Sequence, residues 1–139
     1  MAQTFYQVTI RHEKTLESGK TKMVNENYMT RADNFTMAEA NATTFAMSYW
    51  DDFDIVAIKR TKIEDYIVSS LDDAKPYLLT IGSVGYDDND KVEMTKYQYI
   101  VCAVDIDAAK RHYESNLKSD IADEVLLGIK ETNIIDLIC

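Results

Sequence analysis

The chain carries an internal repeat that constrains its fold more than any other feature. Residue n matches residue n+71 without a gap, so residues 6–67 align with residues 77–138, and sixteen of these 62 positions are identical. About four identities would arise by chance at an ordinary composition. A chain written twice is expected to form two copies of one small unit. Because a unit of about 70 residues buries only about 60% of its unfolded surface, we expect the copies to pack together as one compact domain.

Each copy has the pattern strand, turn, strand, helix, strand. In the first copy residues 5–12 alternate apolar and polar side chains, which predicts a strand. Ser18-Gly19-Lys20 supplies a turn, residues 22–30 return as its partner, and residues 54–61 form the last strand. The second copy repeats this order from Tyr77, with its turn at residues 87–90 and its last strand at 125–132. The pattern therefore predicts three strands for each copy.

A helix is expected between the second and third strands of each copy. Thr36 and Asp107 occupy equivalent positions and are the predicted N-caps. The residues expected to form the buried stripes of the two helices are Met37, Ala38, Phe45 and Tyr49, and Ala109, Tyr113 and Leu117.

These elements predict an α+β fold of two tandem ββαβ units related by a pseudo-twofold axis, with antiparallel sheets and helices packed on one face. The first unit is expected at 1–67, a linker at 68–75 and the second unit at 76–139. The apolar ending, residues 134–139, is interpreted as a strand or a docking segment. We expect a homo-oligomer or a monomer with a pseudo-dimeric core.

Charge and cysteine content limit the class of protein. The formal net charge is −9, which opposes indiscriminate binding to nucleic acid or acidic membranes. The acidic excess is concentrated in the second copy, whereas residues 1–31 are net positive. Two cysteines and the absence of a signal peptide or long apolar run predict a reduced, cytoplasmic protein without membrane spans.

Residues that could carry catalysis do not form a recognisable pattern. His12 and His112 stand at non-equivalent positions, and we expect both on the surface. The acidic run 87–90 does not match a calcium-binding loop and is predicted to be a hairpin turn, Asp51, Asp52 and Asp54 a polar loop, and Cys102 a half-buried thiol. No phosphate-binding or nucleophile motif occurs. We therefore expect no enzyme, no metal and no cofactor.

The face of each sheet that points away from its helix is the candidate binding site. Polar residues on a solvated strand face usually drift apart, yet three such pairs are kept between the copies. Together with neighbouring cations, the predicted nucleic-acid-binding residues are Thr9, Arg11, Lys59, Thr61, Thr80, Lys96, Lys130 and Thr132. Tyr28, Tyr97 and Tyr99 are expected to stack against bases. Cations along phosphates and rings against bases are typical of proteins that bind single-stranded DNA.

Three other interpretations stay open. The first is that threonine is kept only as a strand former and lysine only as a solubilising residue at a sheet edge. The second is a protein-interaction or assembly module with a phage or host protein as its partner, including an inhibitor of a host factor, which the acidic second copy and the apolar ending favour. A small anionic nucleotide held in a cleft between the units is the third interpretation.

The sequence also resembles an uncharacterised family of proteins of about this length from gut anaerobes and their tailed phages. The resemblance rests on F-Y-Q-V-T-I near the start, Y-M-T-R-A-D-N-F-T-M-A-E-A before the first helix, I-K-R-T with its echo I-K-E-T, and the closing I-I-D-L. It implies an accessory protein made inside a bacterial cell, from a crAss-like phage, and it brings no catalytic residues. The duplicated arrangement is also similar to the PC4 and Whirly type of DNA-binding protein, which has four strands in each unit.

Overall fold

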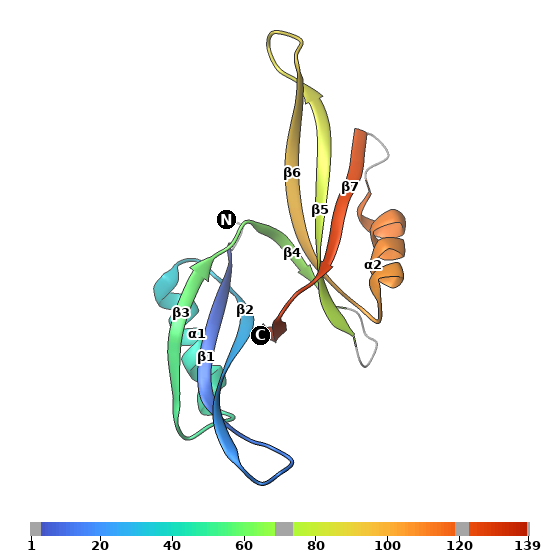
Figure 1. The fold of residues 1–139 in the computed structure, drawn as a ribbon. Coiled ribbons are helices and arrows are strands. Elements are labelled where there is room, and N and C mark those ends of the chain that lie inside the picture. Colours follow the sequence, from blue (N-terminus) through green and yellow to red (C-terminus); the bar gives the residue numbers. More distant parts are fainter. Residues whose placement is uncertain (1–3, 69–73, 119–122, 139) are drawn as a thin grey trace. The chain divides into compact units, whose positions relative to one another are not determined.

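The computed structural model describes residues 4–68, 74–118 and 123–138. They form a mixed α+β fold in which most residues lie in two four-stranded sheets (Figure 1). The chain divides into two compact units. Unit 1 comprises Met1–Thr61 and Asn133–Cys139, and unit 2 comprises Lys62–Thr132. These boundaries differ from the expected 1–67 and 76–139, because each unit takes one edge strand of its sheet from the other copy.

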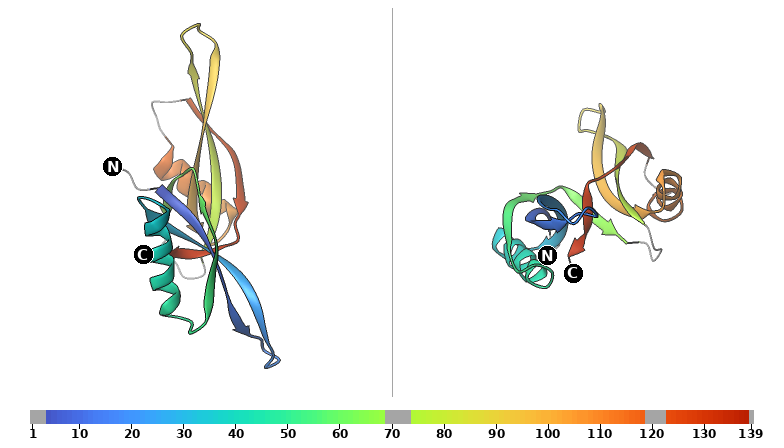
Figure 2. Two further views of the ribbon diagram at one scale, coloured as in Figure 1. Left: turned by 90° about the vertical axis from the view of Figure 1, so that its left-hand side faces the viewer. Right: turned by 60° about the horizontal axis from the view of Figure 1, so that its bottom comes forward.

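Unit 1 contains a sheet with the strand order β3-β1-β2-β8 and one helix, α1. Its elements are β1 (Thr4–Thr15), β2 (Thr21–Ala32), α1 (Phe35–Met47), β3 (Phe53–Arg60) and β8 (Ile134–Ile138). The helix contacts β1, β2, β3 and β8, so it covers one face of this sheet (Figure 2).

Unit 2 contains a sheet with the strand order β4-β6-β5-β7 and a shorter helical segment. Its elements are β4 (Ile63–Ile67), β5 (Lys75–Tyr86), β6 (Val92–Ala103), α2 (Ile106–His112), a π-helical continuation (Tyr113–Leu117) and β7 (Asp123–Glu131). The helix contacts β6 and β7. The β5–β6 hairpin extends beyond the end of β7 (Figure 1).

Both predicted hairpins are confirmed, and both are longer than expected. In unit 1 the turn closes through a hydrogen bond from Leu16 N to Lys20 O of 2.7 Å, with Gly19 in the left-handed region at φ 83°. In unit 2 the Asp87 carboxylate accepts from the backbone N–H of Asn89 and Lys91, at 2.8 and 2.9 Å. The acidic run 87–90 is therefore a hairpin turn, as predicted.

The predicted helix N-caps are wrong, because each cap stands slightly earlier in the chain. The side chain of Asn34 accepts from Met37 N at 2.8 Å, and the side chain of Asp105 accepts from Ala108 N at 2.7 Å. Asn34 and Asp105 are again equivalent positions of the repeat. Thr36 and Asp107 are also acceptable capping residues, so the sequence offered two candidates at each helix start.

The fourth strand of each sheet was not part of the predicted ββαβ unit. β8, at the end of the chain, pairs in parallel with β2, whereas β4, which follows β3, pairs in parallel with β6. The expectation that residues 134–139 include a strand is confirmed for residues 134–138. A parallel partner far away in the sequence leaves no turn signal, so local pattern does not show where these short apolar strands pair.

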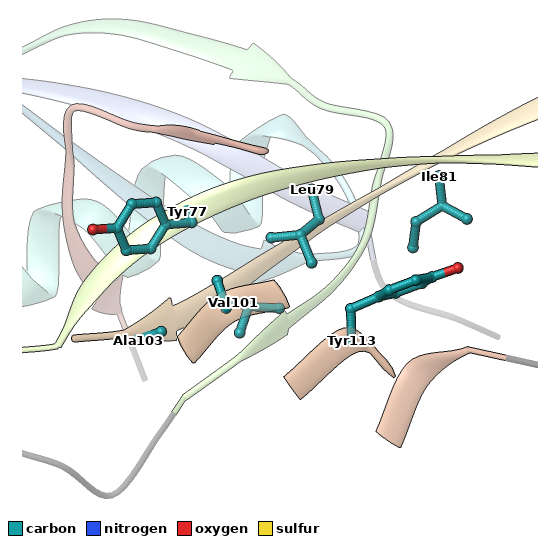
Figure 3. Packing of buried hydrophobic residues seen from close by; sticks show 7 residues of the cluster. Tyr77, Leu79, Ile81, Val101, Ala103 and Tyr113 are labelled. Atoms are coloured by element: carbon teal, nitrogen blue, oxygen red, sulfur yellow. The ribbon is translucent and has the colours of Figure 1, made fainter. Parts of the chain in front are cut away.

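The cores lie between each sheet and its helix. In unit 1 the small side chains of Ala38, Ala42 and Ala46 let α1 approach β1, while Met37 and Tyr49 are exposed instead of buried as predicted. In unit 2 the predicted core residues Ala109 and Tyr113 are buried. Figure 3 shows the cluster to which Tyr113 belongs, together with the strand residues Tyr77, Leu79, Ile81, Val101 and Ala103.

Candidate binding surfaces

The open face of a sheet is defined here as the face that points away from its helix. In unit 1 Val8 and Ile10 pack against α1, so Thr9 and Arg11 on β1 point to the open face. Lys59 on β3 lies opposite Gln7 in the register and therefore shares that face. Three of the predicted site residues, Thr9, Arg11 and Lys59, are thus brought together on one face.

Their surroundings are polar. The Thr9 hydroxyl donates to Asn27 Oδ1 across the strands at 2.7 Å. Arg11 lies opposite Asn25 on β2 and Asp54 on β3. Arg11 and Lys59 are both exposed and form no ion pair with the residues that the structure describes. These two cations are therefore available to an anionic ligand.

Thr61 and Thr132 have a structural role that explains why both copies keep them. The Thr61 hydroxyl donates to Phe5 O at 2.7 Å and its backbone N–H donates to the same oxygen at 3.0 Å. Thr132 makes the same two bonds to Pro76 O, at 3.0 and 3.1 Å. Each threonine therefore fastens the end of the third strand to the start of the first strand in its sheet, and its hydroxyl is already engaged.

In unit 2 the predicted residues also share the open face. Thr80 lies opposite Gln98, Lys96 lies opposite Gly82, and Lys130 lies opposite Leu78. Lys96 and Lys130 are exposed, and Thr80 is half-buried. The residues around them are largely apolar, which distinguishes this face from that of unit 1.

The tyrosines expected to stack against bases point to the other side of their sheets. Tyr28 lies opposite Val8 and is buried against α1, and Tyr99 lies opposite Leu79 and packs against the core of unit 2. Tyr97 lies opposite Ile81, on the helix side. The sequence placed these rings near the right strands but did not fix which face they occupy, because a register shift of one residue exchanges the faces.

Unit 1 contains a buried polar cluster that the sequence pattern did not predict. His12, predicted to be on the surface, is only 4% exposed. Its Nε2 contacts Glu26 Oε1, its Nδ1 donates to Glu13 O at 3.0 Å, and its ring stacks on Trp50 with the centroids 3.9 Å apart. The alternation of β1 was the available signal, since His12 continues the buried series of Val8 and Ile10.

This cluster also raises the pKa of Tyr28. Burial, followed by the adjacent Glu26 carboxylate, raises the pKa of Tyr28 above its ordinary value of 10.0. The Tyr28 hydroxyl donates to Glu26 Oε1 at 3.3 Å. Both ring nitrogens of His12 have a partner, which is the arrangement of a satisfied core histidine. No nucleophilic side chain contacts His12 among the described residues, so the cluster offers no catalytic constellation there.

A cationic pair lies near the tip of the β1–β2 hairpin, on the opposite side of the hairpin from Arg11, because Lys14 continues the alternation of Val8, Ile10 and His12. Lys14 on β1 lies directly opposite Lys22 on β2, and both side chains are exposed. Neither lysine forms an ion pair within the described ranges. The positive balance of residues 1–31 was visible in the sequence, but the direct pairing of these two lysines depends on the hairpin register.

Metal sites and membrane-crossing helices have no candidates in the described part of the chain. Residues 4–68, 74–118 and 123–138 contain no group of three or more His, Cys, Asp or Glu side chains that could hold a metal ion. Among these same residues, none of the helices has the length and apolar character needed to cross a bilayer.

The fold and its surfaces define an α+β protein with two sheet-and-helix units and exposed open faces. Residues 4–139 match the family described as a domain of unknown function, DUF4494, and the chain belongs to this family. No curated protein matches the chain.

Proposed function

We propose that the protein is a non-enzymatic accessory protein that binds nucleic acid through the open face and the hairpin of unit 1. The single observation that carries this proposal is a set of four exposed cations without ion-pair partners in the described structure. Arg11 and Lys59 lie on the open face, and Lys14 and Lys22 lie on the other side of the hairpin near its tip. In line with the resemblance to proteins of crAss-like phages, its setting would be phage replication in the host cytoplasm.

The Lys14–Lys22 pair is the sharpest part of this argument. Like charges directly opposite each other on neighbouring strands destabilise a hairpin, by an amount on the order of 0.2–1 kcal/mol. A phosphate group close to both ammonium groups would remove the repulsion and gain two charge-assisted hydrogen bonds. An anionic ligand therefore gives a physical reason for a pair that otherwise costs stability.

The positions of the tyrosine rings favour contact with phosphates over stacking against bases. Because Tyr28 and Tyr99 are packed on the helix side, their rings do not lie on the open face and we do not propose that they stack against bases. The proposal is therefore contact with phosphates, which is independent of base sequence. A two-stranded β-ribbon also fits the major groove of duplex DNA, so single strands and duplex are both test ligands.

Fluorescence anisotropy with labelled oligonucleotides tests the proposal. Binding at micromolar protein should weaken as salt is raised from about 50 to about 200 mM, with a slope of log affinity against log salt of up to about −3 for single strands if all four cations contact phosphates. Lys59→Glu should weaken binding. Lys14→Glu should also weaken it while replacing a repulsive cross-strand pair by an attractive one, so its fold should be kept.

The matched control is Lys130→Glu, at the position of the second copy that is equivalent to Lys59. It should leave binding unchanged if the nucleic acid contacts unit 1 alone. Absence of salt-sensitive binding for both oligonucleotide forms, or full binding by Lys14→Glu and Lys59→Glu, would refute the proposal.

We also infer that the two units descend from one duplicated ββαβ unit with pseudo-twofold symmetry. The support is that the β1–β3 pairing shifts register between Thr9 and Ile10, and the β5–β7 pairing shifts between Thr80 and Ile81. Thr9 and Thr80 are equivalent positions of the repeat, and so are Ile10 and Ile81. An irregularity at the same place in both sheets is what a common ancestor would leave.

A second candidate function is a protein-interaction module. The observation that favours it is the exposed apolar surface on the open face of unit 2, which includes Tyr86, Val92 and Met94. The two functions use different units and are compatible in one accessory protein.

A further inference from the structure

The outer part of the open face of unit 2 is apolar although it is exposed. Tyr86 on β5 lies opposite Val92 on β6, and Val84 lies opposite Met94. On β7, Val125 lies opposite Gly82. Since Tyr77, Leu79 and Ile81 face the helix, the alternation of β5 puts these residues on the open face.

A large fraction of each of these side chains is exposed to solvent. Tyr86 is 71% exposed, Val92 69%, Met94 47%, Val125 46% and Leu127 44%. These five residues are called the apolar face below. They form a contiguous group across three strands, whereas single scattered apolar residues on a surface are ordinary. A contiguous exposed group marks an interaction site.

Gly82 allows the apolar face to be continuous. A Cβ atom at this position would lie 3.0 Å from Met94 Sδ and 3.1 Å from Leu127 Cδ1. The ends of these two side chains therefore lie over the backbone of β5 and join the contributions of β6 and β7. An ordinary side chain at residue 82 would separate them.

The fold does not require this surface to be apolar. The equivalent positions of the first copy carry Thr15 and Thr21 in place of Tyr86 and Val92, and Asp54 in place of Val125. Unit 1 forms a sheet with the same pairing while exposing these polar side chains. Met23 and Val56, the equivalents of Met94 and Leu127, are apolar and exposed in unit 1 as well, so unit 2 is distinguished by Tyr86, Val92 and Val125, which enlarge the apolar surface there.

Charges around the apolar face restrict what can cover it. The hairpin turn next to Tyr86 carries Asp87, Asp88 and Asp90, and Asp123 lies opposite Val84. Lys91 and Lys96 offset part of this charge. Nucleic acid and anionic membranes are repelled by an acidic rim, and two copies of this face would bring acidic rims together. Charge complementarity therefore favours a basic occupant.

The neighbouring sheet edge suggests how an occupant is held. β4 pairs with β6 between Gln98 and Val101, so the outer edge of β6 from Val92 to Tyr97 has no strand partner within the described residues. An extended segment that adds to a free edge gains main-chain hydrogen bonds and presents alternate side chains to the adjoining face. Such a segment would place its apolar side chains next to Val92 and Met94.

We propose that the apolar face and the adjoining edge of β6 bind an extended, basic segment of a partner protein in which apolar residues alternate with Lys or Arg. The occupant gains burial of apolar surface at roughly 25 cal/mol per Å², and its cations meet the acidic rim. This interaction is independent of the nucleic-acid binding proposed for unit 1.

The test is selection of a displayed library of random dodecapeptides against the full chain. Enriched peptides should be basic and alternate apolar and cationic residues. Synthetic versions of these peptides should bind wild-type protein by fluorescence anisotropy, and their affinity should fall at least tenfold for Met94→Glu. Hydrogen exchange of the complex should show new protection in β6 between residues 92 and 97.

The matched control is Met23→Glu, because Met23 is the equivalent of Met94 in the first copy and is 49% exposed. It should leave peptide binding unchanged, and circular dichroism should show that both variants keep their unfolding midpoints. Oligonucleotide binding should be unchanged in Met94→Glu, which separates this proposal from that for unit 1.

Several results would overturn the proposal. These are the enrichment of acidic or uncharged peptides, equal affinity for Met94→Glu, or no enrichment at all. Sedimentation showing that wild-type protein dimerises and that Met94→Glu is a monomer would assign the face to a second copy of the chain instead.

Discussion

Arg11 in unit 1 and Gly82 in unit 2 occupy equivalent places on the open faces, and the residues directly opposite them on the neighbouring strands differ. Arg11 lies opposite Asp54 on the adjacent strand, whereas Gly82 lies opposite Val125 and is covered by the side chain of Leu127. Both sheets nevertheless have the same strand pairing around these positions. The side chains on the open face can therefore differ without changing the strand pairing of the sheet.

A second difference lies beneath the sheets. Unit 1 buries the polar pair His12–Glu26 against Trp50, whereas the position equivalent to His12 in unit 2 is Ser83, which is half-buried. The helix side of unit 2 is instead a cluster of apolar and tyrosine side chains (Figure 3). Variants at particular positions of the two units test these differences.

The largest expected effect concerns the strand that completes unit 1. Ile138 on β8 is buried in the core with Val8 and Ile10, so Ile138→Ala should lower the free energy of unfolding by about 2–4 kcal/mol. Trp50 is the only tryptophan in the sequence and lies in unit 1. Urea unfolding followed by its fluorescence should therefore report the loss.

The matched variant is Ile67→Ala on β4, which packs against the core of unit 2. It should shift the far-ultraviolet circular dichroism transition and leave the Trp50 transition in place. Equal shifts of the Trp50 transition in both variants would show that the units unfold together and would contradict separate stabilities.

The buried polar pair gives the second effect. His12→Ala removes the ring stacked on Trp50 and one of the partners of Glu26. It should destabilise the protein by about 2–3 kcal/mol, because the half-buried carboxylate keeps only the Tyr28 hydroxyl as a hydrogen-bond donor. Ser83→Ala, the equivalent change in unit 2, should stay within about 0.5 kcal/mol. Urea unfolding followed by circular dichroism measures both. A similar loss of unfolding free energy in the two variants would contradict the idea that the polar pair makes the helix side of unit 1 different from that of unit 2.

A smaller effect tests the role of the shared threonines. Thr61→Val keeps the shape of the side chain and the backbone bond but loses the hydroxyl bond to Phe5 O, at a cost of about 1 kcal/mol. Thr132→Val should cost a similar amount through Pro76 O. Oligonucleotide binding should be unchanged in both. Weaker oligonucleotide binding without loss of stability would show that these threonines contact the nucleic acid.

The smallest effect at neutral pH comes from Tyr28. Its pKa is raised in the folded state above the ordinary value of 10.0, so its contribution to stability is complete below pH 10 and is lost as the pH rises further. Tyr28→Phe should therefore reduce the fall in unfolding free energy above pH 10, as measured by urea unfolding across this range. Tyr99, whose pKa is also raised by burial and by Glu64, provides the matched variant Tyr99→Phe. An unchanged alkaline profile in Tyr28→Phe would contradict the shift.

The local elements were largely predictable because their signals lie close together in the sequence. Alternation predicted β1 and β5, and Gly19 and Asp87 mark the turns that close their hairpins. Helix positions were predicted, but the first cap was placed at Thr36 instead of Asn34. Neighbouring polar residues compete for the cap, and only the backbone geometry decides between them.

The candidate site was predictable in part. Thr9, Arg11 and Lys59 share an open face, as the alternation predicted. Thr61 was selected by its retention in both copies, yet its hydroxyl bonds to the backbone of β1. Retention of a residue in both copies indicates that the residue has a role. It does not show whether that role is a hydrogen bond within the protein or contact with a ligand.

By itself the sequence determined two sets of hairpin, helix and strand, because periodicity and turn residues act over a few positions. The tertiary structure alone decided that β8 completes the sheet of unit 1 and β4 that of unit 2, since parallel pairing joins residues far apart without a local signal. It also decided that His12 is buried on Trp50 and that Met94 and Leu127 meet over Gly82. These contacts depend on strand register and side-chain packing, which no single segment of the chain specifies.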